Sequence, residues 1–403
     1  MLSGQNIIYF APGRWQGLWR NRQQLMSIFA RQNTVLYVES RLSIGQTITY
    51  LRRGNLKLAD FWQAPIHQVA KNLFVLRYPL WAPASNRMYV GHITRKVRRL
   101  CVQYAMRKLH MSDPIVWFAL PSMIDLVPDI PSARLRVYHV VDEYAAYSHL
   151  TPEASQHTET IEREMLQQAD LVVVVSQNLY TAKRRLNPNT FFVPNGVNCD
   201  AYARALDDPQ LPGALQVIKS PRLGYIGLIG DKLNLFMLKE IAEAHPEWSL
   251  VFLGEERAPA QAATWQTLKA LPNVHYLGQV DVSQVPHYVK GFDVGLLPYF
   301  CNRHAENICP LKLYDYLAAG IPIASVDIPA VREFTSYIHL ANSPQNFHQA
   351  IQTALIDTTP ERRQARRDSA RQHSWEVRSE QISEVIQACQ SVRNTVKIGV
   401  KDQ

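Results

Sequence analysis

Lys312 and Asp315 lie three residues apart at the start of a short predicted helix, in the segment that reads ENICPLKLYDYLAAGIPIAS from residue 306. Backbone N–H groups at a helix start carry a partial positive charge and form an anion site, to which Lys312 adds a full charge. Asp315, one turn further along, could accept hydrogen bonds from two hydroxyl groups. A phosphate at the helix start and a ribose diol beside Asp315 would suit a nucleoside diphosphate. The alternative interpretation is an ordinary surface loop followed by a core helix.

The residues around this pair predict a loop, one helix and a buried strand. Pro310 lies just ahead of the helix, where a missing N–H costs nothing, and Leu311 begins its apolar side. Gly320 is expected to end the helix, because glycine adopts a positive φ easily. Residues 321–324 then begin a buried strand.

This segment resembles the nucleotide-sugar binding motif of glycosyltransferases with the GT-B fold. In that family an acidic residue five positions before the glycine of such a helix holds the ribose, and Asp315 occupies this position. Many retaining members carry a glutamate eight residues earlier, where this chain has Asn307 and where Glu306 is one residue away. The form P-L-K-L-Y-D-Y-L-A-A-G-I-P is more similar to bacterial exopolysaccharide and teichuronic-acid type transferases. The resemblance implies a donor site that includes Asn307, Pro310, Leu311, Lys312 and Asp315.

A second part of the donor site is expected after the predicted strand at residues 222–226. The sequence there, from Gly227 to Lys232, resembles the first β–α unit of the donor domain. Gly227 would let the backbone approach a diphosphate, and Lys232 could place a charge on it. No D-x-D triplet lies between the predicted strands, so a metal-dependent GT-A fold is unsupported. The resemblance implies no metal and no other cofactor, because a helix dipole and basic side chains offset the leaving diphosphate.

The candidate acid–base residues lie in the N-terminal half, which opens as a Rossmann-like domain without the G-x-G-x-x-G spacing of dinucleotide sites. A predicted strand at residues 136–141 contains His139 and runs into Asp142 and Glu143. Because the carboxyl ends of parallel strands face the ligand crevice, these three are the candidates. An inverting transferase needs a base to take the proton of the acceptor hydroxyl. Asp142 is the first choice for that base and Glu143 the second, with a helix N-cap as the alternative role.

The length of 403 residues suits two domains, and the composition is that of a globular protein. The pattern predicts an α/β protein with two Rossmann-like domains whose parallel sheets face across a cleft. The expected domains are residues 1–200 for the acceptor and 201–375 for the donor, with a link at 200–221. Residues 376–403 are expected to form a helix that returns to the N-terminal domain. The five cysteines have no metal-ligand spacing and are expected to be free thiols in a reducing cytoplasm.

Positive charge is concentrated at the start of the chain. Residues 1–110 contain 17 Lys and Arg against two acidic residues, whereas residues 201–403 are nearly neutral. A basic helix is predicted at 86–110, and we expect it to pack on the sheet with a solvated charged face. The field of the whole domain is nevertheless expected to attract an anionic membrane surface. No apolar run is long enough to span a membrane, and no signal peptide is recognisable. A cytoplasmic protein at the inner face of the plasma membrane is therefore expected.

These observations predict a hexosyltransferase that moves a sugar from a nucleotide sugar, expected to be a UDP-sugar, to a hydroxyl group. A lipid-linked or polysaccharide acceptor in bacterial surface polysaccharide synthesis is expected. One alternative is a sugar-nucleotide epimerase on the same fold, which would leave the basic N-terminal half without a purpose. Another is a nucleic-acid binding protein, which would leave Lys312 and Asp315 without a role. No nucleic-acid recognition motif is present, so no nucleic-acid partner is expected.

Overall fold

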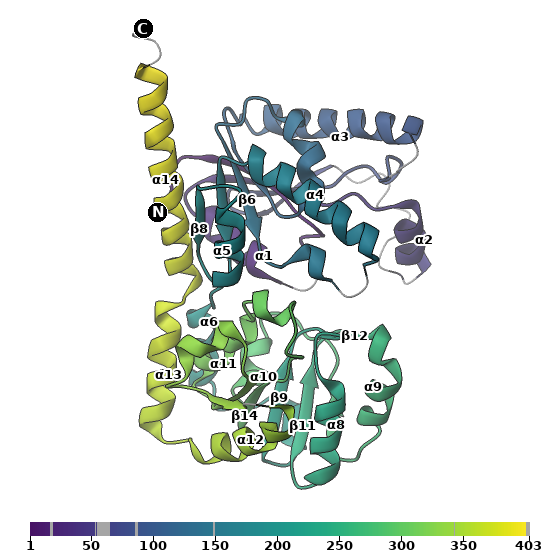
Figure 1. Ribbon diagram of the computed structural model, residues 1–403, viewed down its shortest axis with the longest axis vertical. Coiled ribbons are helices and arrows are strands. Elements are labelled where there is room, and N and C mark those ends of the chain that lie inside the picture. The colour runs from purple at the N-terminus through teal and green to yellow at the C-terminus, as the bar shows by residue number, and fades with distance from the viewer. Residues whose placement is uncertain are drawn as a thin grey trace. The chain divides into compact units, whose positions relative to one another are not determined.

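The computed structural model describes residues 1–16, 19–52, 54, 65–84, 88–147, 150–341 and 343–399. They group into two compact units, which are described separately (Figure 1). The N-terminal unit comprises Met1–Val174, Leu179–Val193 and Ser379–Gln403. The C-terminal unit comprises Val175–Asn178 and Pro194–Arg378. The grouping therefore changes at Pro194, and the residues from Ser379 onward group with the N-terminal unit.

The N-terminal unit is built on an eight-stranded sheet, in the described residues, with the order β3-β4-β2-β1-β5-β6-β7-β8. Every pair is parallel except β3 with β4. The central strands are fully buried, as expected for continuous apolar runs covered on both faces. The strands are β1 (Asn6–Phe10), β2 (Thr34–Val38), β3 (Ile66–Ala70), β4 (Leu73–Leu76), β5 (Ile115–Phe118), β6 (Leu135–Val140), β7 (Leu171–Val174) and β8 (Thr190–Phe192).

Helices flank this sheet and reproduce most of the predicted order. The sequence predicts a single strand, at residues 73–76, within the segment 41–85. The structure also describes α2 and β3 there, whose apolar residues are too sparse to give a clear period. The basic helix predicted at 86–110 is α3. The helical segments are α1 (Asn21–Phe29), α2 (Ile44–Arg52), α3 (Met88–Lys108), η2 (Pro121–Asp129), η3 (Tyr144–Ala146), α4 (Pro152–Gln168) and α5 (Gln177–Arg184).

The C-terminal unit contains a six-stranded parallel sheet, in the described residues, with the order β13-β11-β9-β14-β15-β16. A short pair, β10 with β12, lies outside it. Strand β16 was not predicted, because its three residues give no period. The strands are β9 (Arg222–Ile226), β10 (Ile229–Gly230), β11 (Ser249–Leu253), β12 (Glu256–Arg257), β13 (Val274–Tyr276), β14 (Val294–Leu297), β15 (Ile323–Val326) and β16 (His339–Ala341).

The segment predicted as a link between domains contains two helices, α6 and α7. Helix α6 packs on α10 and α11, so this segment is part of the C-terminal unit. The helical segments of this unit are α6 (Cys199–Asp207), α7 (Gly213–Gln216), α8 (Leu235–Ala244), η4 (Pro259–Gln261), α9 (Ala262–Lys269), α10 (Val285–Val289), η5 (Ala305–Asn307), α11 (Leu311–Ala319), η6 (Pro329–Phe334), η7 (Pro344–Asn346), α12 (Phe347–Ile356) and α13 (Pro360–Gln372). Helix α14 (Trp375–Gly399) begins in this unit and groups with the N-terminal unit from Ser379 onward.

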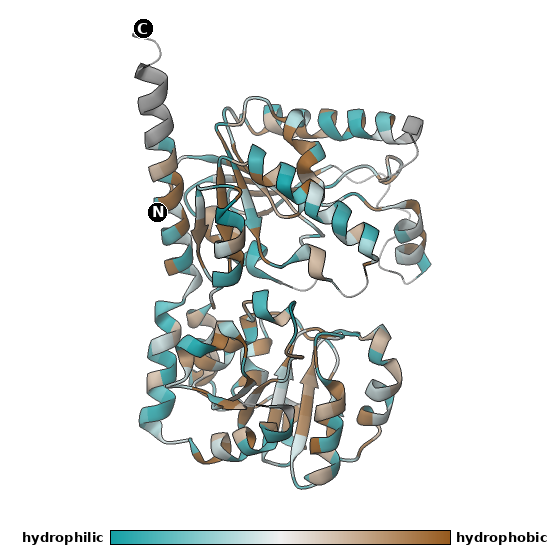
Figure 2. Ribbon diagram, viewed as in Figure 1, coloured by the Kyte–Doolittle hydropathy of each residue, from teal (hydrophilic) through white to brown (hydrophobic). Residues whose placement is uncertain are grey.

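Both units have apolar strands at the centre and mixed helices outside (Figure 2). No helix among the described residues is long and apolar enough to cross a membrane. The known chemistry of parallel sheets places ligand sites at the carboxyl ends of the strands. The candidate residues are therefore expected at those ends.

Candidate functional site

Helix α11 is fixed tightly onto the C-terminal sheet by one tyrosine. The Tyr316 hydroxyl accepts the Ile226 N–H at 3.2 Å and donates to the Gly224 carbonyl at 3.2 Å. A Cβ atom at Gly295 would lie 2.5 Å from the Tyr316 ring, so only glycine leaves room for this ring. The helix ends at Gly320 with φ +76°, which confirms the predicted left-handed cap. The start of α11 is thereby held at the carboxyl edge of β9.

The loop before α11 is held by a second part of the chain. The Asn195 side chain donates to the Cys309 carbonyl at 2.7 Å, and the Asn195 N–H lies 3.4 Å from the Cys309 sulfur. Arg378 in turn donates to the Asn195 carbonyl at 3.1 Å. Pro310 then forms the N-cap position in an extended conformation, with Leu311 as the first helical residue. The first-turn N–H groups of any helix have no helical carbonyl four residues earlier, and in α11 the Leu313 N–H donates to the Pro310 carbonyl at 3.2 Å.

Gly227 and Lys312, both predicted for the donor site, lie side by side. The Lys312 ammonium is 4.9 Å from the centre of the Tyr225 ring. A Cβ atom built at Gly227, which has φ +102°, would lie 3.1 Å from the same ammonium nitrogen. A lysine, a glycine of positive φ and a helix start therefore lie together, which is a suitable arrangement for a diphosphate.

The carboxyl ends of the three neighbouring strands β9, β11 and β13 are each followed by a glycine of positive φ. These are Gly227, Gly254 and Gly278. The Gly254 N–H donates to the Gly278 carbonyl at 2.7 Å, and a Cβ atom at Gly254 would lie 2.0 Å from the Gly227 oxygen. This edge is therefore made of closely packed bare backbone. Gly254 and Gly278 were not among the predicted site residues, although each is the last residue of a predicted apolar strand.

Asp315 is half-buried on α11, where its neighbours include Tyr202 of α6 and Lys312. Burial raises the pKa of Asp315 to about 6, while the Tyr202 side chain and the charge of Lys312 act in the opposite direction. A carboxylate with a raised pKa in a partly open position is a recognised sign of a functional site. Tyr202 was not a predicted site residue, because it lies in the segment that was expected to be a link.

Lys232 and Asn307 lie in the loops beside this centre. Lys232 is exposed between β10 and α8, and its carbonyl accepts the Phe300 N–H at 3.1 Å. Asn307 is buried in η5, where its side chain donates to the Arg303 carbonyl at 2.7 Å. Asn307 therefore supports the loop with its amide group, while Glu306 beside it is exposed.

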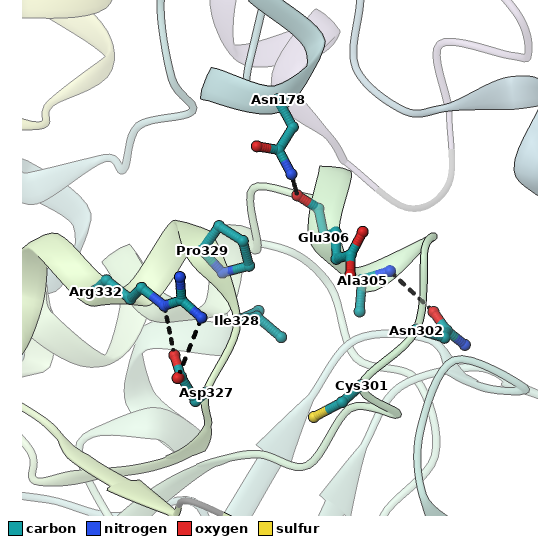
Figure 3. A pocket seen from close by; sticks show the side chains of 9 residues that line it. All are labelled: Asn178, Cys301, Asn302, Ala305, Glu306, Asp327, Ile328, Pro329 and Arg332. Carbon is teal, nitrogen blue, oxygen red and sulfur yellow. Dashed lines mark hydrogen bonds and ion pairs between the residues drawn. The ribbon is translucent and has the colours of Figure 1, made fainter. Parts of the chain in front are cut away.

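A cavity of about 330 Å³ lies between the loop after β14 and the segment after β15 (Figure 3). Asp327 and Arg332 form an ion pair on one side, with nitrogen–oxygen distances of 2.8 and 3.2 Å. On the other side Asn178, which groups with the C-terminal unit, donates to the Glu306 carbonyl at 2.9 Å. Part of the cavity lining, Cys301, Asn302, Ala305 and Glu306, belongs to the loop that leads to α11, and the rest comes from Asn178 and from the segment after β15.

The predicted acid–base residues of the N-terminal unit have different surroundings. Asp142 is half-buried after β6 and accepts the Tyr147 hydroxyl at 2.9 Å. Glu143 is buried and pairs with the Lys183 ammonium at 3.1 Å, and Lys183 also pairs with buried Glu162 at 2.8 Å. Asp142 is therefore a half-buried carboxylate with a hydrogen bond from Tyr147, while Glu143 belongs to a buried charged triad.

His139, the third candidate, lies in the interior of the sheet. Its ring packs against Trp117 with 5.9 Å between centres and is 3% exposed. Burial lowers the pKa of His139 to about 4, so the ring is neutral at pH 7. A ring in this position contributes to the core and has no access to an acceptor. Among the described residues no group of three or more His, Cys, Asp or Glu could hold a metal ion.

Known proteins resemble this chain in sequence and in fold. Residues 220–357 match the family model of glycosyl transferases group 1. A Bacillus subtilis (strain 168) protein, TuaH, whose name describes a teichuronic acid biosynthesis glycosyltransferase, is 28% identical over 284 residues. That match covers 66% of this chain and 70% of TuaH.

Two solved structures share the fold over nearly the whole chain. Sucrose-phosphate synthase from Thermosynechococcus elongatus aligns with a TM-score of 0.69 at 15% identity, covering 96% of this chain and all of that one. WaaG, a glycosyltransferase involved in lipopolysaccharide biosynthesis, aligns with a TM-score of 0.59 at 16% identity, covering 94% of this chain and 99% of that one. The chain has the GT-B fold and contains a domain that matches glycosyl transferases group 1, which supports a glycosyltransferase.

The matched family segment of this glycosyltransferase contains every residue predicted for the donor site. Gly227, Lys232 and the residues of the α11 junction all lie between residues 220 and 357. The acid–base candidates Asp142 and Glu143 lie outside that segment. The predicted fold class, two Rossmann-like domains of the GT-B type, is confirmed.

The raised pKa of Asp315 gives the glycosyltransferase a pH-dependent stability. Between pH 4 and 6 the folded protein keeps a proton that the unfolded chain has released, so this contribution is full below about pH 4 and is lost as the pH rises through 6. We expect Asp315→Asn to raise the free energy of unfolding at pH 7.5 by about 1–3 kcal/mol, since each pKa unit corresponds to about 1.4 kcal/mol. Because Asp315 is only half-buried, solvent screens its charge, and the gain in free energy of unfolding is expected in the lower part of that range.

Urea unfolding of both proteins at pH 4 and pH 7.5 measures this difference. The gain of Asp315→Asn should be close to zero at pH 4. A gain of equal size at both pH values would show that the titration of Asp315 is not its cause. A carboxylate that lowers stability at neutral pH is consistent with a residue kept for ligand binding.

Proposed function

We propose that this glycosyltransferase moves a sugar from a nucleotide sugar, with UDP as the nucleotide, to a hydroxyl of a lipid-linked or polysaccharide acceptor in bacterial surface polysaccharide synthesis. The observation that carries the proposal is the grouping of Gly227, Lys312 and Asp315 around the start of α11. This grouping offers a cation, bare backbone and a carboxylate at spacings that suit a nucleoside diphosphate.

In the proposed donor complex, the diphosphate lies against Gly227 and the first turn of α11, and the Lys312 ammonium neutralises part of its charge. The ribose hydroxyls donate to Asp315, one turn further along the helix. As the bond between sugar and phosphate breaks, negative charge grows on the leaving diphosphate. The helix start and Lys312 are already oriented toward that charge, which lowers the barrier without a metal ion.

The N-terminal unit supplies the acceptor side of the reaction. Asp142 takes the proton from the attacking acceptor hydroxyl if the anomeric configuration inverts, and Tyr147 orients its carboxylate. If the configuration is retained, Asp142 has a binding role instead. Glu143 is engaged with Lys183, so Asp142 is the base that we propose in preference to it.

The surface-polysaccharide role is supported by the relatives. TuaH is described as acting in teichuronic acid biosynthesis and WaaG in lipopolysaccharide biosynthesis. Residues 1–110 contain 17 basic and two acidic residues. This positive charge favours an acceptor attached to a lipid phosphate at the inner face of the plasma membrane.

A binding and turnover screen of nucleotide sugars tests the proposal. The full chain should bind one nucleotide sugar and release its nucleoside diphosphate faster when a saccharide acceptor is present. An epimerase would instead change the configuration of the sugar and transfer no sugar to the acceptor. Conversion of this kind, or the absence of any bound nucleotide sugar, would contradict the proposal.

A further inference from the structure

Helix α3 is fixed to the N-terminal unit by one face. Arg98, buried in the middle of the helix, pairs with Asp125 at 2.8 Å and with Asp129 at 2.9 Å, both from η2. Val102 and Ala105 are fully buried one and two turns further along. Because Arg98 forms two ion pairs, the rotation of α3 about its axis is fixed, and the residues on its opposite face are presented to solvent in a defined arrangement.

That opposite face carries large apolar side chains. Ile93, Leu100 and Tyr104 are 62%, 64% and 51% exposed. Their spacings of seven and four residues put them on one line along the helix. A single exposed apolar residue needs no explanation, but a line of three on one rigid helix marks an interaction surface. Hydrophilic and hydrophobic residues alternate along α3 in Figure 2.

Basic residues flank this apolar line, and the sequence of α3 contains no acidic residue. Lys96 and Arg107 lie on one side of the line and Lys108 on the other, as the helical period of 100° per residue requires. The Lys108 ammonium lies 6.0 Å from the centre of the Tyr104 ring. The exposed basic residues are Arg95, Lys96, Arg99, Arg107 and Lys108.

We propose that this face of α3 docks on an anionic lipid bilayer, with Ile93, Leu100 and Tyr104 among the headgroups and the flanking cations on lipid phosphates. The inference rests on the proposed function, because docking on a membrane would bring the enzyme to a lipid-linked acceptor. Apolar insertion and attraction of Lys and Arg to anionic lipid act together in such helices. The sequence alone favoured a solvated charged face, because it could not show which apolar residues of α3 point outward.

The two other occupants of such a face fit the residues less well. The phosphates of a nucleic acid would pair with the cations, but they offer no apolar surface to exposed Ile93 and Leu100. A second copy of this chain could cover the apolar line, but it would bring two helices of the same positive charge together. An anionic bilayer is the partner that satisfies both the apolar line and the cations around it.

Flotation of the full chain with lipid vesicles tests the proposal. The wild type should float with vesicles of mixed phosphatidylcholine and phosphatidylglycerol, and not with phosphatidylcholine alone. The double variants Ile93→Ser/Leu100→Ser and Lys96→Glu/Arg107→Glu should each bind the anionic vesicles at least about tenfold more weakly. These residues are exposed, so thermal unfolding should be unchanged.

Matched controls come from exposed residues of the C-terminal unit. Val217→Ser/Ile356→Ser removes two apolar side chains that are 83% and 80% exposed, and Lys219→Glu/Arg371→Glu reverses two exposed charges. Both controls should float like the wild type. Equal losses in controls and α3 variants would overturn the proposal.

Three further results would also overturn it. The first is no flotation of the wild type with anionic vesicles. The second is that the wild type binds DNA and not vesicles, and that the α3 variants lose the DNA binding. The third is a dimer in solution that the α3 variants convert to a monomer. Vesicle binding as expected together with no binding of any nucleotide sugar would reject the proposed function and leave this surface in place.

Discussion

Asp142→Asn is expected to lower the rate of sugar transfer by about 10²–10⁴-fold, which is the usual contribution of a general base. Asparagine has the same shape and can still accept the Tyr147 hydroxyl, which lies 2.9 Å from the carboxylate. It cannot take a proton from the acceptor. Asp142 belongs to the N-terminal unit, whereas the proposed donor residues belong to the C-terminal unit, so the affinity for the donor should be nearly unchanged.

Steady-state transfer with the best donor, together with donor binding, separates these two effects. Tyr147→Phe is the matched control, because it removes the hydrogen bond to Asp142 and keeps the carboxylate. Its rate should fall much less than that of Asp142→Asn. If Asp142 is the base, the product has inverted configuration. If Asp142→Asn transfers sugar within about tenfold of the wild-type rate, Asp142 is not the base.

Lys183→Met is expected to lower the free energy of unfolding by about 3–5 kcal/mol, the usual cost of removing one partner from a buried ion pair. Lys183 lies between Glu143 at 3.1 Å and Glu162 at 2.8 Å, and the three side chains are buried. Burial lowers the pKa of Lys183, but the charges of Glu162 and Glu143 outweigh burial and raise it overall. Without the lysine, two carboxylates would face each other in the interior.

Urea unfolding at neutral pH measures this loss, and a second substitution tests its cause. Glu162→Gln removes one of the two carboxylates, so in the Lys183→Met background it should restore part of the lost stability. The Tyr138 hydroxyl, 3.1 Å from Glu162, can still donate to the glutamine oxygen. Losses that simply add in the double variant would show that the charges of this triad are not coupled.

The strands and the central helix of the donor unit could be predicted closely because their signals are local. The run LYDYLAAGIP defines α11 by its apolar side and its glycine cap, and the helix ends where that pattern ends. Strand β9 follows from the apolar run RLGYI in the same way. The pairing of Gly227 with Lys312 was expected only from the resemblance, because the two residues are far apart in the sequence.

What the sequence could not show depends on distant contacts. Tyr202 lies beside Asp315 only because residues 199–207 fold as α6 on α11, and a segment with prolines and mixed polarity predicts a link instead. Lys183 and Glu143 are 40 residues apart in the sequence, and no pattern in either segment predicts that they form an ion pair. The outward direction of the apolar residues of α3 likewise depends on the ion pairs of Arg98.

Titration calorimetry of the full chain with UDP tests the proposed donor site at the start of α11 most directly. The wild type is predicted to bind one UDP per chain. Lys312→Ala should bind it at least about tenfold more weakly, because a charge-assisted contact to the diphosphate is lost. Asp315→Ala should also weaken binding, through the ribose. If both variants bind UDP as tightly as the wild type, the donor site is not where this account places it.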